Sequence, residues 1–345
     1  MLRRLRTILP LSVAVSLALA LAAPVVAAAQ TMVCSMLTIR VPSVDGGPVD
    51  VKMAGTLCRP EFQPMPHTVQ LLVHGATYTR AVWNWPQSPA TYSYAQDAID
   101  AGYATFAVDR LGHGESDHPA ANNLTIQAGT TALHGVVQAL RAGALGGTPF
   151  TKVIFVGTSL GAVHGYDYGG RYSDIDGYAF FGSVHFIKQS WFNLFQSNVQ
   201  PWPPDPNSGY LTSTPGSRGA LFYNTATADP AVITQDEALK DTITGAEINT
   251  ALPFVQVSAA SSPTQSINKP VLIHMGQFDN LVCGSPDGIT CTTSSIQSLE
   301  QPYFTHATSF TVQITASSGH QLSEHPTAPT THTNVINWIK GFALP

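Results

Sequence analysis

The sequence predicts an α/β fold, in which helices cover both faces of a mostly parallel central sheet. Short apolar runs, typical of buried strands, alternate along the chain with longer segments of helical periodicity. Strands of a parallel sheet are buried on both faces, so they appear in a sequence as nearly continuous apolar stretches. Their alternation with helices is typical of a layered α/β architecture.

The predicted elements begin with a hairpin, Leu37–Val41 and Val49–Leu57, which turns at Asp45-Gly46-Gly47-Pro48. Further strands are predicted at Val69–Val73, Ala104–Val108, Val153–Val156, Gly177–Phe181, Val271–Met275 and Phe310–Thr315. Helices are predicted at Tyr94–Ala101, at Ile126–Ala142, from Leu160 onward, and at Pro329–Phe342. No internal repeat interrupts this order, and the length suits one large domain with an insertion.

Residues 1–29 predict a cleaved signal peptide. Arg3, Arg4 and Arg6 form a basic start, Ile8–Val26 is almost wholly apolar, and Ala27–Ala29 offer a small-residue cleavage site. A membrane anchor is the alternative, but the small residues and the polar sequence after them favour cleavage. No later stretch is long and apolar enough to span a bilayer. We therefore expect a protein secreted to the periplasm or the cell exterior, without a stable membrane anchor.

Export changes how the four cysteines are interpreted. In an oxidising compartment the simplest pairing is two local bridges, Cys34–Cys58 across the first hairpin and Cys283–Cys291 across a short loop. Four cysteines allow three connectivities, so this pairing rests on proximity in the sequence alone. No cysteine and histidine residues have the spacing of metal ligands, so no metal site is expected.

The charge balance argues against a nucleic-acid partner. The chain has 16 lysine and arginine residues against 21 aspartate and glutamate residues, and three of the 16 lie in the predicted signal peptide. Nucleic-acid binding needs clustered basic side chains, which the remaining sequence lacks.

Residues 183–268 interrupt the alternation of strands and helices, and they are too long for a simple connection. We interpret them as a cap or lid over the carboxyl ends of the strands, with a core formed by residues 30–182 and 269–345. The aromatic side chains of this insertion either contact substrate or pack its own small core. They are Trp191, Phe192, Phe195, Trp202, Tyr210, Phe222 and Tyr223.

The sequence Gly157-Thr158-Ser159-Leu160-Gly161 directly follows the predicted strand Val153–Val156 and leads into a predicted helix. A strand that ends in G-x-S-x-G before a helix is the pattern of a nucleophile elbow, in which a serine occupies a strained turn. Small flanking residues are needed because the backbone folds tightly around that serine.

Four further motifs follow predicted strands: His74-Gly75, Asp109–Ser116, Gly276-Gln277-Phe278-Asp279 and Gly319-His320. Together with the elbow, they make residues 50–345 resemble the α/β-hydrolase superfamily. The resemblance implies an α/β-hydrolase fold, with residues 183–268 where this superfamily places its cap. It also implies that Asp109–Ser116 is a structural loop without a chemical role.

The resemblance implies a catalytic triad of Ser159, Asp279 and His320, in the chain order of the superfamily. A neutral serine hydroxyl needs an adjacent base, and the base needs an acid that fixes its tautomer. His320 follows the last predicted strand, and His325 is the competing base. Asp279 follows strand Val271–Met275, and Asp287 is the competing acid.

An oxyanion hole is expected from two backbone N–H groups. Leu160 provides one, and Ala76 is the first choice for the other, with Thr77 as the second. His74 is expected to brace this loop without transferring a proton. The aromatic residues Tyr78, Trp83 and Trp85 follow the loop and either line the substrate pocket or pack in the core.

These residues predict a secreted serine hydrolase that cleaves a carboxylic ester or lactone through an acyl-enzyme, without a cofactor. The substrate is expected to be a small ester-like molecule, and the aromatic insertion hints at an apolar one. One alternative is a cofactor-free perhydrolase or haloperoxidase, or a carbon–carbon hydrolase, on the same triad. The other is a non-catalytic binding protein that keeps this fold.

Overall fold

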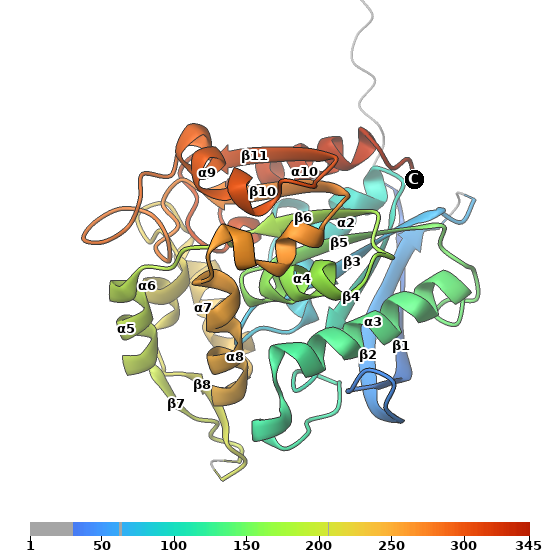
Figure 1. Cartoon of the computed structure of the whole chain (residues 1–345), viewed down its shortest axis with the longest axis horizontal. Helices are drawn as coiled ribbons and strands as arrows, with labels where there is room; N and C mark the ends of the chain where they lie inside the picture. Colours follow the sequence, from blue (N-terminus) through green and yellow to red (C-terminus); the bar gives the residue numbers. More distant parts are fainter. Residues whose placement is uncertain (1–29, 62–63, 206) are drawn as a thin grey trace, which may run out of the picture.

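An eight-stranded sheet forms the centre of the protein (Figure 1). The computed structural model describes residues 30–345 except 62, 63 and 206, so the predicted signal peptide lies outside the described residues. The strands are β1 (Met32–Pro42), β2 (Val49–Pro60), β3 (Thr68–Val73), β4 (Ala104–Asp109), β5 (Lys152–Thr158), β6 (Gly177–Phe181), β10 (Pro270–Gly276) and β11 (Ser309–Thr315). Their spatial order is β1-β2-β4-β3-β5-β6-β10-β11. Strands β1, β2 and β4 pair antiparallel and all others pair parallel, which confirms the predicted sheet.

Helices cover both faces of this sheet. Helices α3 (Ile126–Ala142) and α4 (Leu160–Arg171) pack on one face, and α2 (Tyr94–Asp100) and α10 (Ala328–Lys340) pack on the other. The short helix α1 (Pro89–Tyr92) lies beside α10, and α9 (Thr293–Glu300) packs against β11. Because β3, β4 and β6 are buried along their whole length, their sequences are mostly apolar.

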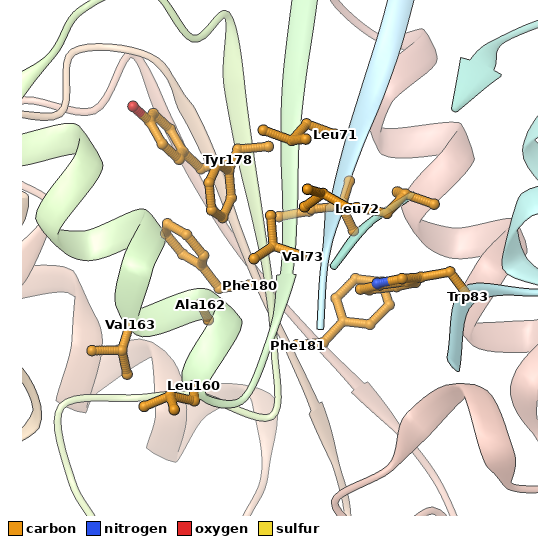
Figure 2. Close-up of a cluster of buried hydrophobic side chains, with 14 of the residues drawn as sticks. Leu71, Leu72, Val73, Trp83, Leu160, Ala162, Val163, Tyr178, Phe180 and Phe181 are labelled. Carbon is orange, nitrogen blue, oxygen red and sulfur yellow. The ribbon is translucent and has the colours of Figure 1, made fainter. Parts of the chain in front are cut away.

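The aromatic residues of β6 show how both faces are filled. Figure 2 shows Tyr178 and Phe180 on the side of α4, whereas Phe181 turns towards Trp83. The ring centroids of Phe181 and Trp83 are 5.9 Å apart. Trp83 is 1% exposed, and Tyr78 and Trp85 are buried as well. These three aromatic residues, for which the sequence left two roles open, therefore pack in the core.

Between β6 and β10 the chain leaves the sheet for residues 183–268, which we call the β6–β10 segment. It contains α5 (Gln189–Ser197), α6 (Arg218–Phe222), α7 (Pro230–Leu239) and α8 (Gly245–Val255). Its strands β7 (Val199–Pro201), β8 (Tyr210–Ser213) and β9 (Ile243–Thr244) form a small antiparallel sheet. In Figure 1 these helices lie on the opposite side of the picture from β1 and β2. Helix α8 packs against α3 and α4.

The four cysteines form the two local pairs expected from the sequence. Cys34 of β1 lies directly opposite Cys58 of β2 and is bonded to it. Cys283 is bonded to Cys291 and closes a loop after β10. Among the residues that the structure describes, no helix has the length and apolarity to cross a bilayer.

Helices α1 and α9, which flank the sheet, were not predicted from the sequence, and α1 has only four residues. Two parallel neighbours such as β10 and β11 require a crossover connection, which is usually helical. However, α9 is short and polar, and among its residues only Ile296 and Glu300 are buried. Its apolar periodicity is therefore too weak to be recognised from sequence, unlike that of α3, whose bounds coincide with the prediction.

Candidate active site

Ser159 lies on a sharp turn between β5 and α4. It has φ 52° and ψ −120°, a backbone conformation that residues other than glycine rarely adopt. Its N–H donates to the Phe181 carbonyl oxygen at 2.8 Å, which ties the turn to β6. A Cβ at Gly161 would overlap the Val73 carbonyl oxygen, so the close approach of α4 to β3 requires glycine there. This strand–turn–helix geometry is that of a nucleophile elbow.

The loop after β3 passes beside Ser159. A Cβ at Gly75 would lie 3.0 Å from the Ser159 Cβ, and Ala76 and Ser159 line the same pocket. The Thr77 N–H donates to the Thr242 carbonyl oxygen at 3.0 Å. Thr77 was the second choice for an oxyanion donor, and this hydrogen bond occupies its N–H.

Two other backbone N–H groups beside Ser159 have no such partner. Neither Ala76 nor Leu160 donates its backbone N–H to another of the described residues. Leu160 is the first residue of α4, and the first N–H groups of a helix have no partner within it. Both donors expected from the sequence are thus available for a ligand.

Asp279 and His320 meet beyond the ends of β10 and β11. His320 Nδ1 lies 2.9 Å from Asp279 Oδ2, and both side chains are fully buried. The Leu281 N–H donates to Asp279 Oδ1 at 2.9 Å, which fixes the carboxylate. A carboxylate accepts hydrogen bonds, so it favours the tautomer with the proton on Nδ1 and leaves Nε2 as an acceptor. The Phe222 ring stacks on His320 at 6.0 Å between centroids.

His325, the competing base, is held as a structural residue. Its Nε2 accepts the N–H of Gly319 at 3.1 Å and the N–H of Asn224 at 3.2 Å. Its Nδ1 donates to the Gln321 carbonyl oxygen at 2.7 Å. Burial lowers the pKa of His325, which keeps the ring neutral. His325 therefore braces the loop that carries His320, because both of its ring nitrogens are occupied.

Asp287, the competing acid, points to another part of the molecule. Its Oδ2 accepts the Ser190 N–H at 2.8 Å, and the Ser190 hydroxyl donates to Oδ1. These hydrogen bonds join the disulfide-closed loop to the first turn of α5. Asp287 is exposed, whereas the carboxylate that contacts His320 belongs to Asp279.

His320 lies close to the Ser159 turn. A Cβ at Gly182 would lie 3.0 Å from His320 Cε1, and Gly182 follows Phe181, which accepts the Ser159 N–H. His320 Nε2 is buried and has no hydrogen-bond partner among the described residues. A catalytic hydrogen bond is often long before substrate binds, and an unpartnered buried nitrogen favours its formation.

Ser159 opens into a pocket that, together with the open solvent at its entrance, encloses about 740 Å³ of empty space. The core contributes residues that follow β3, β5, β6 and β10, and the β6–β10 segment contributes the opposite wall. None of the described residues that line the pocket carries a charge. Apart from Ser183, the lining from the segment is apolar, and it includes Trp191, Phe192, Phe195, Phe222, Ile243, Ile248, Ala251, Leu252 and Val255.

The loop after β3 is held from behind by Arg110. The Arg110 N–H donates to His74 Nε2 at 2.9 Å, its Nε donates to the His74 carbonyl oxygen, and its Nη2 donates to the Gly75 carbonyl oxygen at 3.2 Å. Burial and the Arg110 charge lower the pKa of His74 well below its usual range. His74 is therefore neutral and donates from Nδ1 to the Gly75 carbonyl oxygen, which is a bracing contact.

Arg110 is paired in turn with Glu247 of α8. Arg110 Nη1 donates to Glu247 Oε1 at 2.6 Å, and both side chains are 1% exposed. Burial alone would raise the pKa of Glu247, but the charges of Arg110 and His113 lower it to about 2. Glu247 also accepts the Thr244 N–H in the capping box that starts α8.

The roles of Arg110 and Glu247 were not predicted from the sequence. Arg110 stands in the Asp109–Ser116 motif, to which we had assigned no chemical role, and Glu247 is 137 residues away in the chain. The capping-box spacing of Thr244 and Glu247 was visible, but it does not reveal a distant arginine. Within the described part of the chain, no group of three or more histidine, cysteine, aspartate or glutamate residues could hold a metal ion.

The serine turn after β5, with an acid and a histidine after two later strands, defines the class of α/β hydrolases. The model of the Alpha/beta hydrolase family matches residues 70–329, and the chain belongs to this family. A comparison with curated proteins finds no match.

Several solved structures share this fold. A thermophilic esterase from Thermogutta terrifontis is 15% identical, with a TM-score of 0.57 over 88% of this chain and 98% of its own. An epoxide hydrolase from Vigna radiata is 15% identical, with a TM-score of 0.57 over 90% and 98%. The enol-lactonase from Burkholderia xenovorans LB400 is 13% identical, with a TM-score of 0.55 over 87% and 99%. At these identities the similarity establishes the fold.

Proposed function

We propose that this protein is a serine hydrolase that cleaves carboxylic ester or lactone bonds through an acyl-enzyme. The observation that carries the proposal is the arrangement around Ser159. The serine sits on a strained elbow at the bottom of an apolar pocket, and His320, oriented by Asp279, lies beside it. An elbow serine with a base and an orienting acid is the arrangement that nucleophilic acyl transfer requires.

In the proposed reaction Ser159 Oγ attacks the carbonyl carbon while His320 Nε2 takes the hydroxyl proton. Asp279 keeps the Nδ1 proton in place and stabilises the imidazolium that forms. His320 then gives the proton to the departing alcohol oxygen, and the Ser159 ester remains. Water gives a proton to His320 and attacks this ester. His320 then returns the proton to the departing Ser159 Oγ, which releases the acid and restores both residues. Every bond that forms or breaks in this sequence involves only side chains of this protein, substrate and water.

The backbone N–H groups of Leu160 and Ala76 stabilise the oxyanion in this proposal. Ala76 and Leu160 line the pocket together with Ser159, and neither N–H group donates to another described residue. Removing one oxyanion donor typically costs about 10²–10³-fold in rate. The occupied N–H of Thr77 supports Ala76 as the second donor.

The pocket supports an uncharged, apolar substrate. A carboxylate or ammonium group would lose its hydration there without meeting an opposite charge among the described lining residues. The Trp191 Nε1 donates to the Leu221 carbonyl oxygen at 2.8 Å. Because this hydrogen bond satisfies the one polar atom of the indole ring, Trp191 offers the pocket an apolar surface. We infer that an aliphatic acyl chain or an aromatic ring occupies this space.

The β6–β10 segment acts as a cap in this proposal, because its apolar residues form the wall opposite Ser159. We also propose that the mature protein is secreted. The two disulfides suit an oxidising compartment, and the basic and apolar residues 1–29 have the pattern of a signal peptide.

Labelling with a fluorophosphonate probe tests the proposal. The mature protein should take up one equivalent, and Ser159→Ala should take up none while it remains folded. If the folded protein is not labelled, the proposal of a serine hydrolase is overturned and a non-catalytic binding protein is favoured. Three assays then separate an esterase from a perhydrolase. They are turnover of p-nitrophenyl esters of varied chain length, turnover of a lactone, and formation of a peracid from acetate and peroxide.

A further inference from the structure

Thr77, directly after the proposed oxyanion donor Ala76, has a strained backbone. Its φ is 62°, a region that is unfavourable for a β-branched residue. Such strain is unfavourable and persists only where the surrounding structure enforces it. The contacts that enforce the strained backbone of Thr77 therefore indicate which residues fix the position of the neighbouring Ala76.

Three residues of the β6–β10 segment hold Thr77. Its N–H donates to the Thr242 carbonyl oxygen at 3.0 Å, and its carbonyl oxygen accepts the Asp241 N–H at 2.9 Å. Arg218 Nη1 lies 2.5 Å from Thr77 Oγ1, to which it donates. Both peptide groups and the side chain of Thr77 are thus fixed by residues that lie outside the sheet.

Arg218 is itself fixed by Asp236. Its Nη2 donates to Asp236 Oδ1 at 2.7 Å and its Nε donates to Oδ2 at 3.0 Å, with both side chains fully buried. The guanidinium carbon lies 4.1 Å from the centre of the Tyr78 ring, and the Tyr78 hydroxyl donates to Asp236 Oδ2. A buried pair of this kind keeps one geometry, because breaking it leaves an uncompensated charge.

The peptide group before Ala76 is held from the other side. Arg110 and His74 both donate to the Gly75 carbonyl oxygen. In a planar trans peptide the N–H points away from the carbonyl oxygen. The Ala76 N–H is therefore directed away from Arg110 and His74, and Ala76 lines the pocket that contains Ser159.

We propose that the β6–β10 segment positions the oxyanion donor through two arginine–carboxylate pairs. Glu247 holds Arg110, which orients the Gly75–Ala76 peptide, and Asp236 holds Arg218, which fixes Thr77. The four side chains are positioning residues, since none of them lines the pocket. This inference rests on the proposed serine hydrolase, because it assigns the Ala76 N–H to the oxyanion.

The same segment also contacts the proposed base. Phe222, at the end of the helix that begins with Arg218, stacks on His320, and its carbonyl oxygen accepts the Gln321 N–H at 3.1 Å. Helix α6 therefore contacts both the loop after β3 that carries Ala76 and Thr77, which we call the oxyanion loop, and the loop that carries His320, which we call the base loop. Mutation can separate the two contacts, because Arg218 contacts the oxyanion loop and Phe222 contacts the base loop.

The test compares Thr77→Val with Thr77→Ser, and Glu247→Gln with Glu300→Gln. Valine removes the hydroxyl that Arg218 holds, and with it the hydrogen bond from that hydroxyl to the Ala76 carbonyl oxygen, but it leaves the Arg218–Asp236 pair intact. Serine keeps the hydroxyl and can make both contacts. Glu300 is an equally buried acid that contacts His185, and it makes no contact with the oxyanion loop. Each variant is assayed at a temperature at which circular dichroism shows it folded.

Thr77→Val and Glu247→Gln should lower kcat by about 10- to 100-fold with KM changed less than about twofold, since small misplacement at a reacting centre has effects of this size. An alkyl trifluoromethyl ketone, which forms an oxyanion on the serine, should bind more weakly by the same factor as kcat/KM. Thr77→Ser should recover most of the kcat lost in Thr77→Val, and Glu300→Gln should stay within about twofold of wild type.

Equal losses in Glu247→Gln and Glu300→Gln would overturn the proposal, as would ketone binding that does not follow kcat/KM in the variants. Failure of the hydrolase itself gives a different result. In that case the wild type would neither turn over esters nor be labelled at Ser159, whatever the variants do.

Discussion

The two sides of the proposed active site are held in different ways. The Ser159 turn is positioned by the sheet and by α4, through the Phe181 carbonyl oxygen and the close approach of Gly161 to β3. The oxyanion loop depends on residues 218, 241 and 242 of the β6–β10 segment, and the pocket wall is formed by that segment. Substitution of the catalytic residues that follow sheet strands should therefore abolish activity, whereas substitutions in the segment should reduce activity or change substrate preference.

The largest effects are expected at the nucleophile and the base. Ser159→Ala and His320→Ala should each lower kcat by roughly 10⁶-fold, because residues that act as a unit lose their function together. The double variant should be no worse than either single variant. Steady-state kinetics with a p-nitrophenyl ester measures this. Additive losses in the double variant would show that the two side chains act independently.

A smaller but still large effect is expected at the acid. Asp279→Asn should lower kcat by about 10⁴-fold, because an amide favours the wrong histidine tautomer. Asp287→Asn is the matched control, because this residue contacts Ser190 at the start of α5. It should stay within about threefold of wild type in the same assay. The reverse order of the two variants would identify Asp287 as the acid.

In the segment, substitution of a pocket residue should change substrate preference. Phe192→Ala removes a ring that lines the pocket, and it should lower kcat/KM for an octanoate ester by roughly 10-fold or more. The value for the acetate ester should change little, because its chain does not reach this wall.

Trp202→Ala is the matched control for this comparison. Trp202 belongs to the same segment but stacks on His118, away from the pocket lining. The ratio of octanoate to acetate activity should be unchanged in this variant. An equal shift of the ratio in both variants would mean that the segment acts through its overall stability.

The smallest expected effect concerns stability where the segment meets the base loop. Burial and the nearby Asp236 charge raise the pKa of Glu324 well above its usual value of 4.5, against the opposing charge of Arg218. Neither carboxyl oxygen of Glu324 has a hydrogen-bond partner among the described residues. The native state therefore keeps a proton that the unfolded chain releases above pH 4.5, so stability falls as pH rises.

Glu324→Gln removes this titration and keeps the shape of the side chain. Urea unfolding at pH 4 and at pH 8 should show that the variant gains stability relative to wild type at the higher pH. A difference between the two proteins that is the same at both pH values would contradict the raised pKa.

More of the elbow and the sheet than of the β6–β10 segment could be predicted from the sequence. Ser159, Asp279 and His320 each follow a strand that was predicted from the sequence, and short-range patterns of this kind locate a residue at the edge of a sheet. The contacts of Arg110 with Glu247 and of Arg218 with Thr77 span more than 130 residues. No local pattern predicts which buried polar side chains will meet, so these contacts emerged only from the structure.

The aromatic residues of the segment show the same limit. The sequence located seven of them without separating substrate contacts from core packing. In the structure Trp191, Phe192, Phe195 and Phe222 line the pocket, whereas Tyr210 and Tyr223 are buried elsewhere. The segment has short elements and irregular turns, so neither helical nor strand periodicity indicates which side of it faces Ser159.

The central claim is that Ser159 carries the acyl group during turnover. Rapid quenching of the reaction with a p-nitrophenyl ester, followed by intact-mass measurement and peptide mapping, tests it most directly. We predict a burst of p-nitrophenol with about one acyl group per protein, located on Ser159 and absent from Ser159→Ala. Turnover without an acyl adduct, or an adduct that persists in Ser159→Ala, would contradict it.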